Sequence, residues 1–282
     1  MGINMRKIWF IVVTAILLTS PFVAASTMIA TEQIQPQIRP HSSSEFTHTV
    51  FIEEETTSWC PSCPNAAEAL YSLYNNSGYP FYFVALVTNI NPIAKIRSWY
   101  HYQATAIPTL FIDGGFNQTV GSGSTPEQTE QIYSPLIELA GERTIHPLEL
   151  TTSVVGHGDA KLDITVTVKN TGTKLYVGFV RSYVTEIVSR WKNHDGDPYH
   201  FGFLDYAIKR VVFLGPQKSR TYTMTWNGAA KHSNLTFSDI ADDNIMVITS
   251  VAHWQPHLIE EVQYIKKHFA FYVDQTSGAT VE

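Results

Sequence analysis

The spacing of apolar residues predicts a first region of alternating strands and helices. From Thr47 onward, short apolar runs of strand character alternate with segments of helical periodicity. In chain order they read THTVFIEEE, CPSCPNAAEALYSLYNN, PFYFVALVT, NPIAKIRSWYHYQ, PTLFIDGG, FNQTVGS and TPEQTEQIYSPLIELAGE. We expect the order β-α-β-α-β-β-α, with Thr125 as the cap of the last helix and Pro126 in its first turn.

After His146 the pattern changes to strand alternation. The segments are LELTTSVV, AKLDITVTVKNTGT, KLYVGFVRSYVTEIV, RVVFLG, SRTYTMTWNG, NIMVITSVAHW and KKHFAFYVD, mostly separated by Gly, Asn or Pro turns. No long helix is indicated apart from a candidate over 203–210. Strands at this spacing predict a β-sandwich. We therefore expect a first domain over 46–144, a sandwich domain over 145–275 and a tail over 276–282.

The N-terminal segment has the pattern of a secretory signal. Residues 1–25 carry Arg6 and Lys7 before a largely apolar run, and the small residues Val23 and Ala25 close it. This pattern predicts export, with cleavage after Ala25. An uncleaved segment acting as a membrane tether is the alternative, because the apolar stretch is nearly long enough to span. We expect an extracytoplasmic protein, whether periplasmic, cell-surface or secreted.

Composition supports a globular chain with room for two domains. It has 282 residues, of which 44% are hydrophobic and 16% charged. Residues 26–45 are polar and carry prolines and a serine run, so we interpret them as a tether. The net charge is −6, and loss of the two cations Arg6 and Lys7 with the signal makes it −8. No basic cluster is present, so we expect no nucleic-acid partner.

Cys60 and Cys63 are the only cysteines of the chain. The pair has three candidate uses: a redox couple, half of a metal site, or a structural staple. A loop closed over two residues restrains little of the unfolded chain, and zinc sites usually need four ligands. At the start of a helix, the positive dipole end favours a thiolate. Cys60 is then the attacking sulfur and Cys63 the resolving one, and the uncharged Pro61-Ser62 between them favours a reductase or isomerase.

Two motifs carry a family resemblance. VFIEEETTSWCPSC resembles the active-site strand and turn of the thioredoxin superfamily, including Trp59 before the first cysteine, and YQATAIPTLFIDGG is similar to its cis-proline segment. The layout resembles secreted two-domain proteins of the outer-membrane thioredoxin-like type, and DITVTVKNTG resembles a strand and turn of adhesion-type sandwiches. The resemblance implies an α/β thioredoxin-like domain followed by an all-β immunoglobulin-like sandwich.

The resemblance also implies roles for residues around the cysteines. The Ile107-Pro108 bond is expected to be cis and to face the sulfurs, where a substrate peptide pairs as an added strand. Trp59, Ile107 and Thr109 are the implied substrate contacts. Glu54, six positions before Cys60, is the implied proton acceptor. Its neighbours Glu53 and Glu55 should point to the opposite face of the strand. The alternative is that all three carboxylates are exposed at an edge.

These observations predict an exported thiol-disulfide oxidoreductase acting on protein disulfides. Its catalytic residues are Cys60, Cys63, Pro108 and Glu54. The expected partners are protein disulfide or dithiol clients and an electron donor or acceptor, with no cofactor and no resident metal. The alternative is a non-catalytic binding or scaffold protein of the cell surface, in which the cysteine pair stays oxidised.

Three histidine-containing segments are candidate metal sites. The loop NHDGDPYH holds a group of ligand-type residues, His194, Asp195, Asp197 and His200, but its Asp-Gly-Asp-Pro favours an ordinary polar hairpin. The segment HWQPH (253–257) is expected to end a strand, with Trp254 packed and Pro256 turning the chain. A copper-delivery role would require His101 close to both cysteines, and a surface histidine is the favoured interpretation.

Overall fold

The computed structural model describes residues 46–261 and 264–282, so the predicted signal (1–25) and the predicted tether (26–45) lie outside the described residues. Strand β1 (Val50–Thr56) is buried along its whole length. It pairs in parallel with β2 (Phe81–Val87) on one side and antiparallel with β3 (Thr109–Ile112) on the other. Strand β4 (Asn117–Val120) extends this part of the sheet by pairing with β3.

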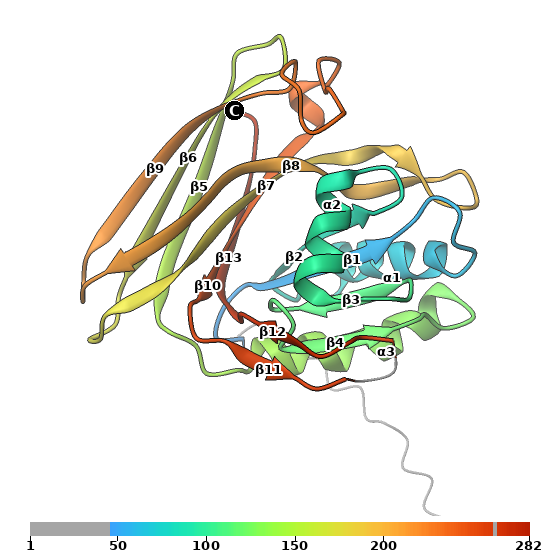
Figure 1. Ribbon diagram of the computed structural model, residues 1–282, viewed down its shortest axis with the longest axis horizontal. Helices are drawn as coiled ribbons and strands as arrows, with labels where there is room; N and C mark the ends of the chain where they lie inside the picture. The colour runs from blue at the N-terminus through green and yellow to red at the C-terminus, as the bar shows by residue number, and fades with distance from the viewer. Residues whose placement is uncertain (1–45, 262–263) are drawn as a thin grey trace, which may run out of the picture. The chain divides into compact units, whose positions relative to one another are not determined.

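Helices cover both faces of these strands (Figure 1). α1 (Cys63–Asn76) and α3 (Pro126–Gly141) share an apolar core with one face of β1, β2 and β3. α2 (Pro92–Ile96) continues into the π-helical η2 (Arg97–Tyr102) on the opposite face, where Tyr102 stacks on Phe111 with ring centroids 3.9 Å apart. β1 is therefore enclosed on both faces as well as on both edges.

The second half of the chain is built of long strands. β5 (Leu148–Gly156), β6 (Lys161–Asn170) and β9 (Ser219–Asn227) form a three-stranded sheet. Four further strands pair antiparallel with one another, in the order β13 (Val273–Thr280), β10 (Ile245–His253), β7 (Tyr176–Lys192) and β8 (Pro198–Leu214). A second apolar core lies between the three-stranded sheet and β7, β8 and β10. The short elements are η3 (Asp242–Asn244) and the β11 (His257–Ile259) and β12 (His268–Ala270) pair.

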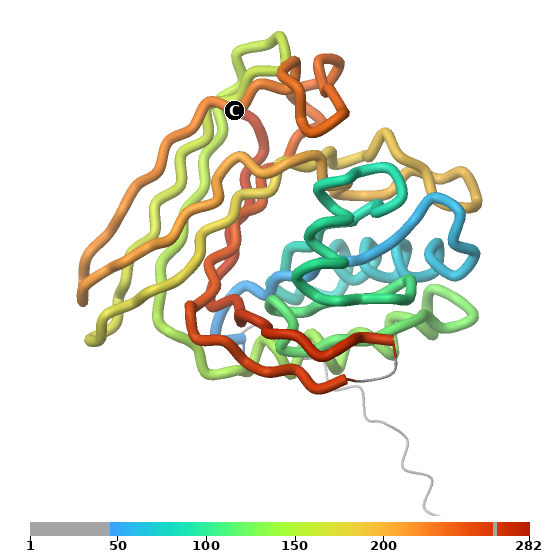
Figure 2. The backbone as a smooth tube through the Cα atoms, viewed as in Figure 1, coloured from blue at the N-terminus to red at the C-terminus, as the bar shows by residue number. Residues whose placement is uncertain are grey.

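One sheet runs through both halves of the chain. Its strand order is β13-β10-β7-β8-β2-β1-β3-β4, and β8 joins β2 in parallel at Gly202 and Ala85. Side chains reinforce this junction: the Asn91 amide donates to the carbonyls of Phe203 and Leu204, at 2.6 and 2.9 Å. Figure 2 shows the backbone of the long strands β7 and β8 running from the second half of the chain towards the first. The described residues accordingly belong to one compact unit.

The predicted fold class is therefore wrong. The described chain is mostly β and is organised by a large mixed sheet, whereas the expectation was an α/β thioredoxin-like domain followed by a separate immunoglobulin-like sandwich. The assignment to the thioredoxin superfamily, and to the secreted two-domain type, is corrected with it. Local periodicity identifies strands but not their partners, and the pairing of β2 with β8 has no local signal.

The predicted order of elements before residue 142 is confirmed, and one later prediction is wrong. Thr125 caps α3, accepting a hydrogen bond from the Gln128 N–H at 3.3 Å. The candidate helix at 203–210 is instead part of β8. The β7–β8 ladder shifts register at Ser182/Tyr183 and at Val184/Thr185, opposite this segment. Such irregularities interrupt the two-residue alternation by which a strand is recognised. Among the described helices, none is both long and apolar enough to span a membrane.

Candidate active site

Cys60 and Cys63 form a disulfide at the start of α1. Cys60 lies in the turn after β1, and its N–H donates to the Thr57 carbonyl at 3.4 Å; the Cys63 N–H donates to the Cys60 carbonyl at 3.3 Å. The N-cap residue, Ser62, makes no side-chain capping bond, and the first turn of α1 carries no acidic residue. The first N–H groups of the helix therefore have no capping side chain as a competing acceptor and favour a thiolate beside them.

The disulfide lies directly beneath an exposed turn. Cys60 and Cys63 have only 2% and 0% of their surface exposed, whereas Trp59 is 62% exposed. Pro61 and Ser62, between the two cysteines, are also exposed. A partner reaching the sulfurs must therefore approach through this turn, where Trp59 presents an exposed apolar surface.

The loop before β3 ends at the same edge of the sheet as the cysteine turn. The Ile107-Pro108 peptide bond is cis, as the sequence resemblance implied. Thr109 begins β3 and pairs with Glu55, near the end of β1. Thr109 is fully buried, and its hydroxyl donates to the Ala106 carbonyl at 2.7 Å. Its side chain thus holds the loop, and any contact with a substrate falls to its backbone or to Ile107.

A cavity of about 410 Å³ lies beside the disulfide turn. It brings together two of the predicted substrate contacts, Trp59 and Ile107. The remaining lining residues come from the end of β1, from η2 and from the loop before β3, together with two residues of other loops: Glu55, Thr57, Thr88, Trp99, Gln103, Ala104, Thr105, Ala106 and Lys266. Two tryptophans and two alanines make this surface suited to apolar side chains.

Glu54 is buried on the face of β1 that carries α1 and α3. It has no exposed surface, and neither carboxylate oxygen has a hydrogen-bond partner among the described residues. Burial raises the pKa of Glu54 to about 8. The carboxyl is therefore mostly protonated at neutral pH and exchanges a proton a little above it. By strand alternation it shares its face with Val50 and Ile52, which pack in the core with α1.

Glu53 points to the opposite face, as strand alternation predicted. Arg97 binds it with two hydrogen bonds, from Nε to Oε1 at 2.7 Å and from Nη2 to Oε2 at 2.6 Å. The hydroxyls of Tyr183 and Tyr102 also donate to it. Burial acts to raise the pKa of Glu53, but the charge and hydrogen bonds of Arg97 outweigh it and hold the pKa below its ordinary value. Glu53 is an ionised structural anchor.

Glu55 is a candidate functional group to which the sequence interpretation assigned no role. It faces away from Glu54, is 2% exposed, and lines the cavity beside Trp59. Burial raises its pKa to about 7, with contacts to Ser98 and Trp99 offsetting part of that effect. The alternative that all three carboxylates are exposed is wrong. The run of glutamates in an otherwise apolar strand was the sequence feature that could have identified Glu55 as a functional candidate.

The histidine loop predicted as a polar hairpin has that structure. His194, Asp195 and Asp197 are exposed in the turn between β7 and β8. The N–H groups of Asp195 and Asp197 both donate to the Asn193 side-chain oxygen at 3.0 Å, which is turn chemistry. His200 lies outside the turn and stacks on a tyrosine of α1. His101, the candidate for a copper role, lines a different cavity from the one at the disulfide.

The segment HWQPH contributes a grouping that sequence analysis missed. His253 ends β10 as predicted, but Trp254 is 59% exposed, so its predicted packing is wrong. His253 Nε2 lies 2.9 Å from His257 Nε2. On its other side, His253 gathers with His146 and Asp274, whose ligand atoms all lie within 4.8 Å of one another. Because the three residues lie on segments far apart in the sequence, no local motif predicts that they come together.

No protein-family model matches this chain, and no curated protein does. Similar solved structures include a structural-genomics target from Agrobacterium tumefaciens, 13% identical with a TM-score of 0.41, covering 83% of this chain and 94% of that one. β-Glucosidases from Listeria innocua and Kluyveromyces marxianus are 13% and 18% identical, each with a TM-score of 0.26 over 48% of this chain. The match spans only 16% and 14% of those enzymes. Likenesses this weak carry no argument about fold or activity.

Proposed function

We propose that this chain is an exported thiol-disulfide oxidoreductase that reduces or isomerises protein disulfides through Cys60 and Cys63. The observation that carries the proposal is the position of the pair: a formed disulfide at an uncapped helix start, beneath an exposed turn and beside a cavity. A staple over two residues contributes little stability, so this placement favours exchange chemistry over a structural role. The basic and apolar pattern of residues 1–25 supports export.

The reaction begins from the reduced chain. The Cys60 thiolate attacks one sulfur of a partner disulfide; a Cys60–partner bond forms, the partner's S–S bond breaks, and one partner thiolate leaves. Cys63 then attacks the Cys60 sulfur, closes the Cys60–Cys63 bond and releases the second partner thiolate. Two electrons pass from the chain to the partner. An external dithiol of the extracytoplasmic compartment restores the reduced pair by the same steps in reverse.

The two buried carboxyls supply the proton chemistry in this proposal. Cys63 must lose its proton before it attacks, and Glu54, which lies on the α1 side of β1, is the proposed acceptor. With a pKa of about 8 it accepts the proton through the minor fraction that is ionised at neutral pH, and this fraction grows as the pH rises. Glu55, with a pKa of about 7, faces the cavity and is suited to protonating a partner thiolate as it leaves. Glu54 would thus serve the resolving cysteine, and Glu55 would serve the leaving group of the partner.

The cavity supplies the partner contacts. Trp59 belongs to the cysteine turn and Ile107 to the cis-proline loop, and Trp99 adds a second aromatic surface. An extended segment with an apolar residue next to its cysteine fits this lining. Recognition would therefore depend on the apolar residues flanking the disulfide rather than on charge.

Catalysed reduction of insulin disulfides tests the proposal. The mature chain is assayed with dithiothreitol as electron donor, against the matched variants Cys60→Ser and Trp59→Ala. We expect Cys60→Ser to fall to the uncatalysed rate and Trp59→Ala to keep turnover with a raised KM. Equal rates for the wild type and Cys60→Ser would overturn the proposal and favour a scaffold protein whose cysteine pair stays oxidised.

A further inference from the structure

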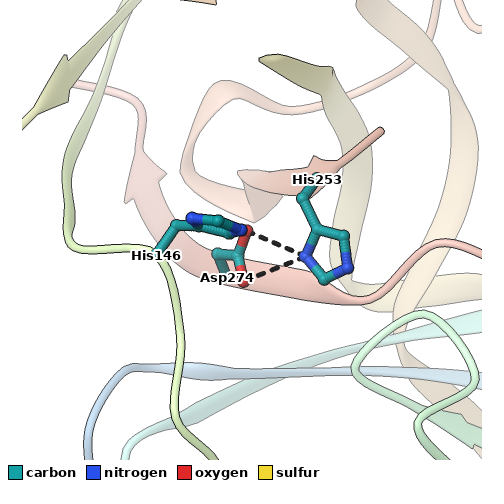
Figure 3. A group of neighbouring side chains, drawn as sticks. All are labelled: His146, His253 and Asp274. Atoms are coloured by element: carbon teal, nitrogen blue, oxygen red, sulfur yellow. Dashed lines mark hydrogen bonds and ion pairs between the residues drawn. The ribbon is translucent and has the colours of Figure 1, made fainter. Parts of the chain in front are cut away.

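We propose that His146, His253 and Asp274 form a binding site for one divalent transition-metal ion, with Zn²⁺ as the best-suited ion. Figure 3 shows the three side chains converging from separate elements. His146 lies between α3 and β5, His253 is the last residue of β10, and Asp274 is the second residue of β13. Among the described residues, this is the one group of His, Cys, Asp and Glu whose ligand atoms gather within 4.8 Å.

Two of the three ligands already lie at a spacing close to that of ligands on one ion, where they now share a hydrogen bond. His253 Nδ1 lies 3.2 and 3.1 Å from the two oxygens of Asp274. Metal–ligand bonds of about 2.0–2.2 Å place tetrahedral ligand atoms about 3.3–3.6 Å apart. His253 and Asp274 are 7% and 0% exposed and are therefore held in place, whereas His146 is exposed and has room to adjust. Since all three ligand atoms lie within 4.8 Å of one another, the exposed His146 can complete the site by moving towards the other two.

Neighbouring groups orient the two fixed ligands. The Tyr176 hydroxyl donates to Asp274 Oδ2 at 3.2 Å, which fixes the plane of the carboxylate. His253 uses its other nitrogen, Nε2, to contact His257 Nε2 at 2.9 Å, and His257 in turn stacks on Tyr272. Metal-bound histidines usually engage their second nitrogen in this way, which fixes the ring and its tautomer. Coordination through Nδ1 leaves the His253 ring proton on Nε2, facing His257.

The local charge accommodates a cation. Arg143 approaches Asp274 Oδ1 to 3.6 Å, but the same guanidinium also pairs with Asp113 at 3.2 Å. Asp113 also contacts His48 Nε2, at 2.7 Å, so Arg143 is divided between two buried carboxylates, one of which has a second partner. Two imidazoles and one carboxylate are ligands that suit zinc and its neighbours rather than calcium or magnesium. Three protein ligands leave the fourth position, on the exposed side of His146, to water or another small ligand.

The site is independent of the proposed redox chemistry. None of its three ligands lines the cavity beside the disulfide. A bound ion would join the segment after α3 to β10 and β13, so it would cross-link strands at the edge of the large sheet. Its failure would leave the thiol chemistry untouched, and failure of the thiol chemistry would leave the metal site untouched.

Zinc titration against a competing chromophoric chelator tests this inference. The protein is the untagged mature chain with its disulfide intact, so that free thiols cannot bind the ion. The variants are His146→Ala, which removes an exposed ligand, and His194→Ala, a matched control in the exposed hairpin. We expect one zinc per chain in the wild type and the control, with affinity at least about tenfold weaker in His146→Ala.

Thermal unfolding supplies a second readout. At zinc concentrations about 100-fold above Kd, the Tm of the wild type and of His194→Ala should rise by roughly 5 °C, and that of His146→Ala should not. Asp274→Asn, if it folds, should behave like His146→Ala. Absence of stoichiometric zinc binding by the wild type, or equal zinc affinity in His146→Ala and His194→Ala, would overturn the inference.

Discussion

The two faces of β1 place neighbouring glutamates in opposite electrostatic situations. Glu53 and Glu54 are both fully buried. Glu53 meets Arg97 and two tyrosine hydroxyls, whereas Glu54 meets an apolar core and has no hydrogen-bond partner among the described residues. The pKa of Glu53 is lowered and that of Glu54 is raised to about 8. Burial alone therefore does not decide whether a carboxyl is protonated. The charged and polar groups that face it decide this.

The difference has consequences of opposite sign for stability. A carboxyl with a lowered folded-state pKa stabilises the fold above its unfolded pKa, and this stability is lost as the pH falls through the folded-state value. A carboxyl with a raised pKa is held neutral in the folded state, so the fold loses stability as the pH rises from the unfolded value towards the folded one. Glu53 should thus weaken the fold in acid, and Glu54 should weaken it between the ordinary glutamate pKa of 4.5 and about 8.

The largest expected effect on stability comes from breaking the ion pair between Glu53 and Arg97. Glu53→Gln leaves the Arg97 guanidinium buried without a counter-charge, so we expect the free energy of unfolding to fall by about 3–5 kcal/mol. Urea denaturation of the oxidised protein at neutral pH measures it. Glu53→Gln combined with Arg97→Met is the control and should recover much of the loss, since both charges are then gone. A single variant as stable as the wild type would show that the pair does not anchor β1.

The raised pKa of Glu54 is tested by the pH dependence of stability. In the wild type, Glu54 should lower the free energy of unfolding by about 3 kcal/mol between pH 5 and pH 8, because its pKa of about 8 lies far above the ordinary value of 4.5. Glu54→Gln cannot ionise, so its stability curve should be flatter by that amount. Denaturant midpoints across this range supply the comparison. Parallel curves for the variant and the wild type would mean that Glu54 titrates normally.

Glu55 should give a smaller effect of the same sign. Its pKa of about 7 implies that Glu55→Gln removes about 2 kcal/mol of pH-dependent destabilisation over the same interval. Because Glu55 lines the cavity, the variant should also move the pH profile of insulin reduction near neutrality. The activity profile is measured at saturating dithiothreitol, and the stability effect is measured separately by denaturant unfolding. An unaltered activity profile would remove Glu55 from the proposed chemistry while leaving its stability effect in place.

The sequence predicted what depends on neighbours in the chain. The cap at Thr125, the start of α1 near Cys63 and the opposite orientation of Glu53 and Glu54 all follow from local rules, and all are observed. The sequence did not predict which strands pair. Ala85 and Gly202 meet across a junction that no periodicity marks, and this junction joins the two halves in one sheet.

The candidate site shows the same division. The cysteine pair and the loop at Pro108 were found from motifs, because each motif is contiguous. The raised pKa of Glu55 and the grouping of His146 with Asp274 depend on segments brought together by folding. Distances between such segments are set by tertiary packing, which a single sequence does not reveal.

Trapping of a mixed disulfide tests the central claim most directly. Reduced Cys63→Ser is incubated with oxidised insulin, and the products are weighed by mass spectrometry before and after dithiothreitol; Cys60→Ser is treated identically. The account predicts a dithiothreitol-sensitive adduct of one insulin molecule through Cys60, and none with Cys60→Ser. Absence of any adduct from Cys63→Ser, with the Cys60 thiol confirmed to be reduced, would contradict it.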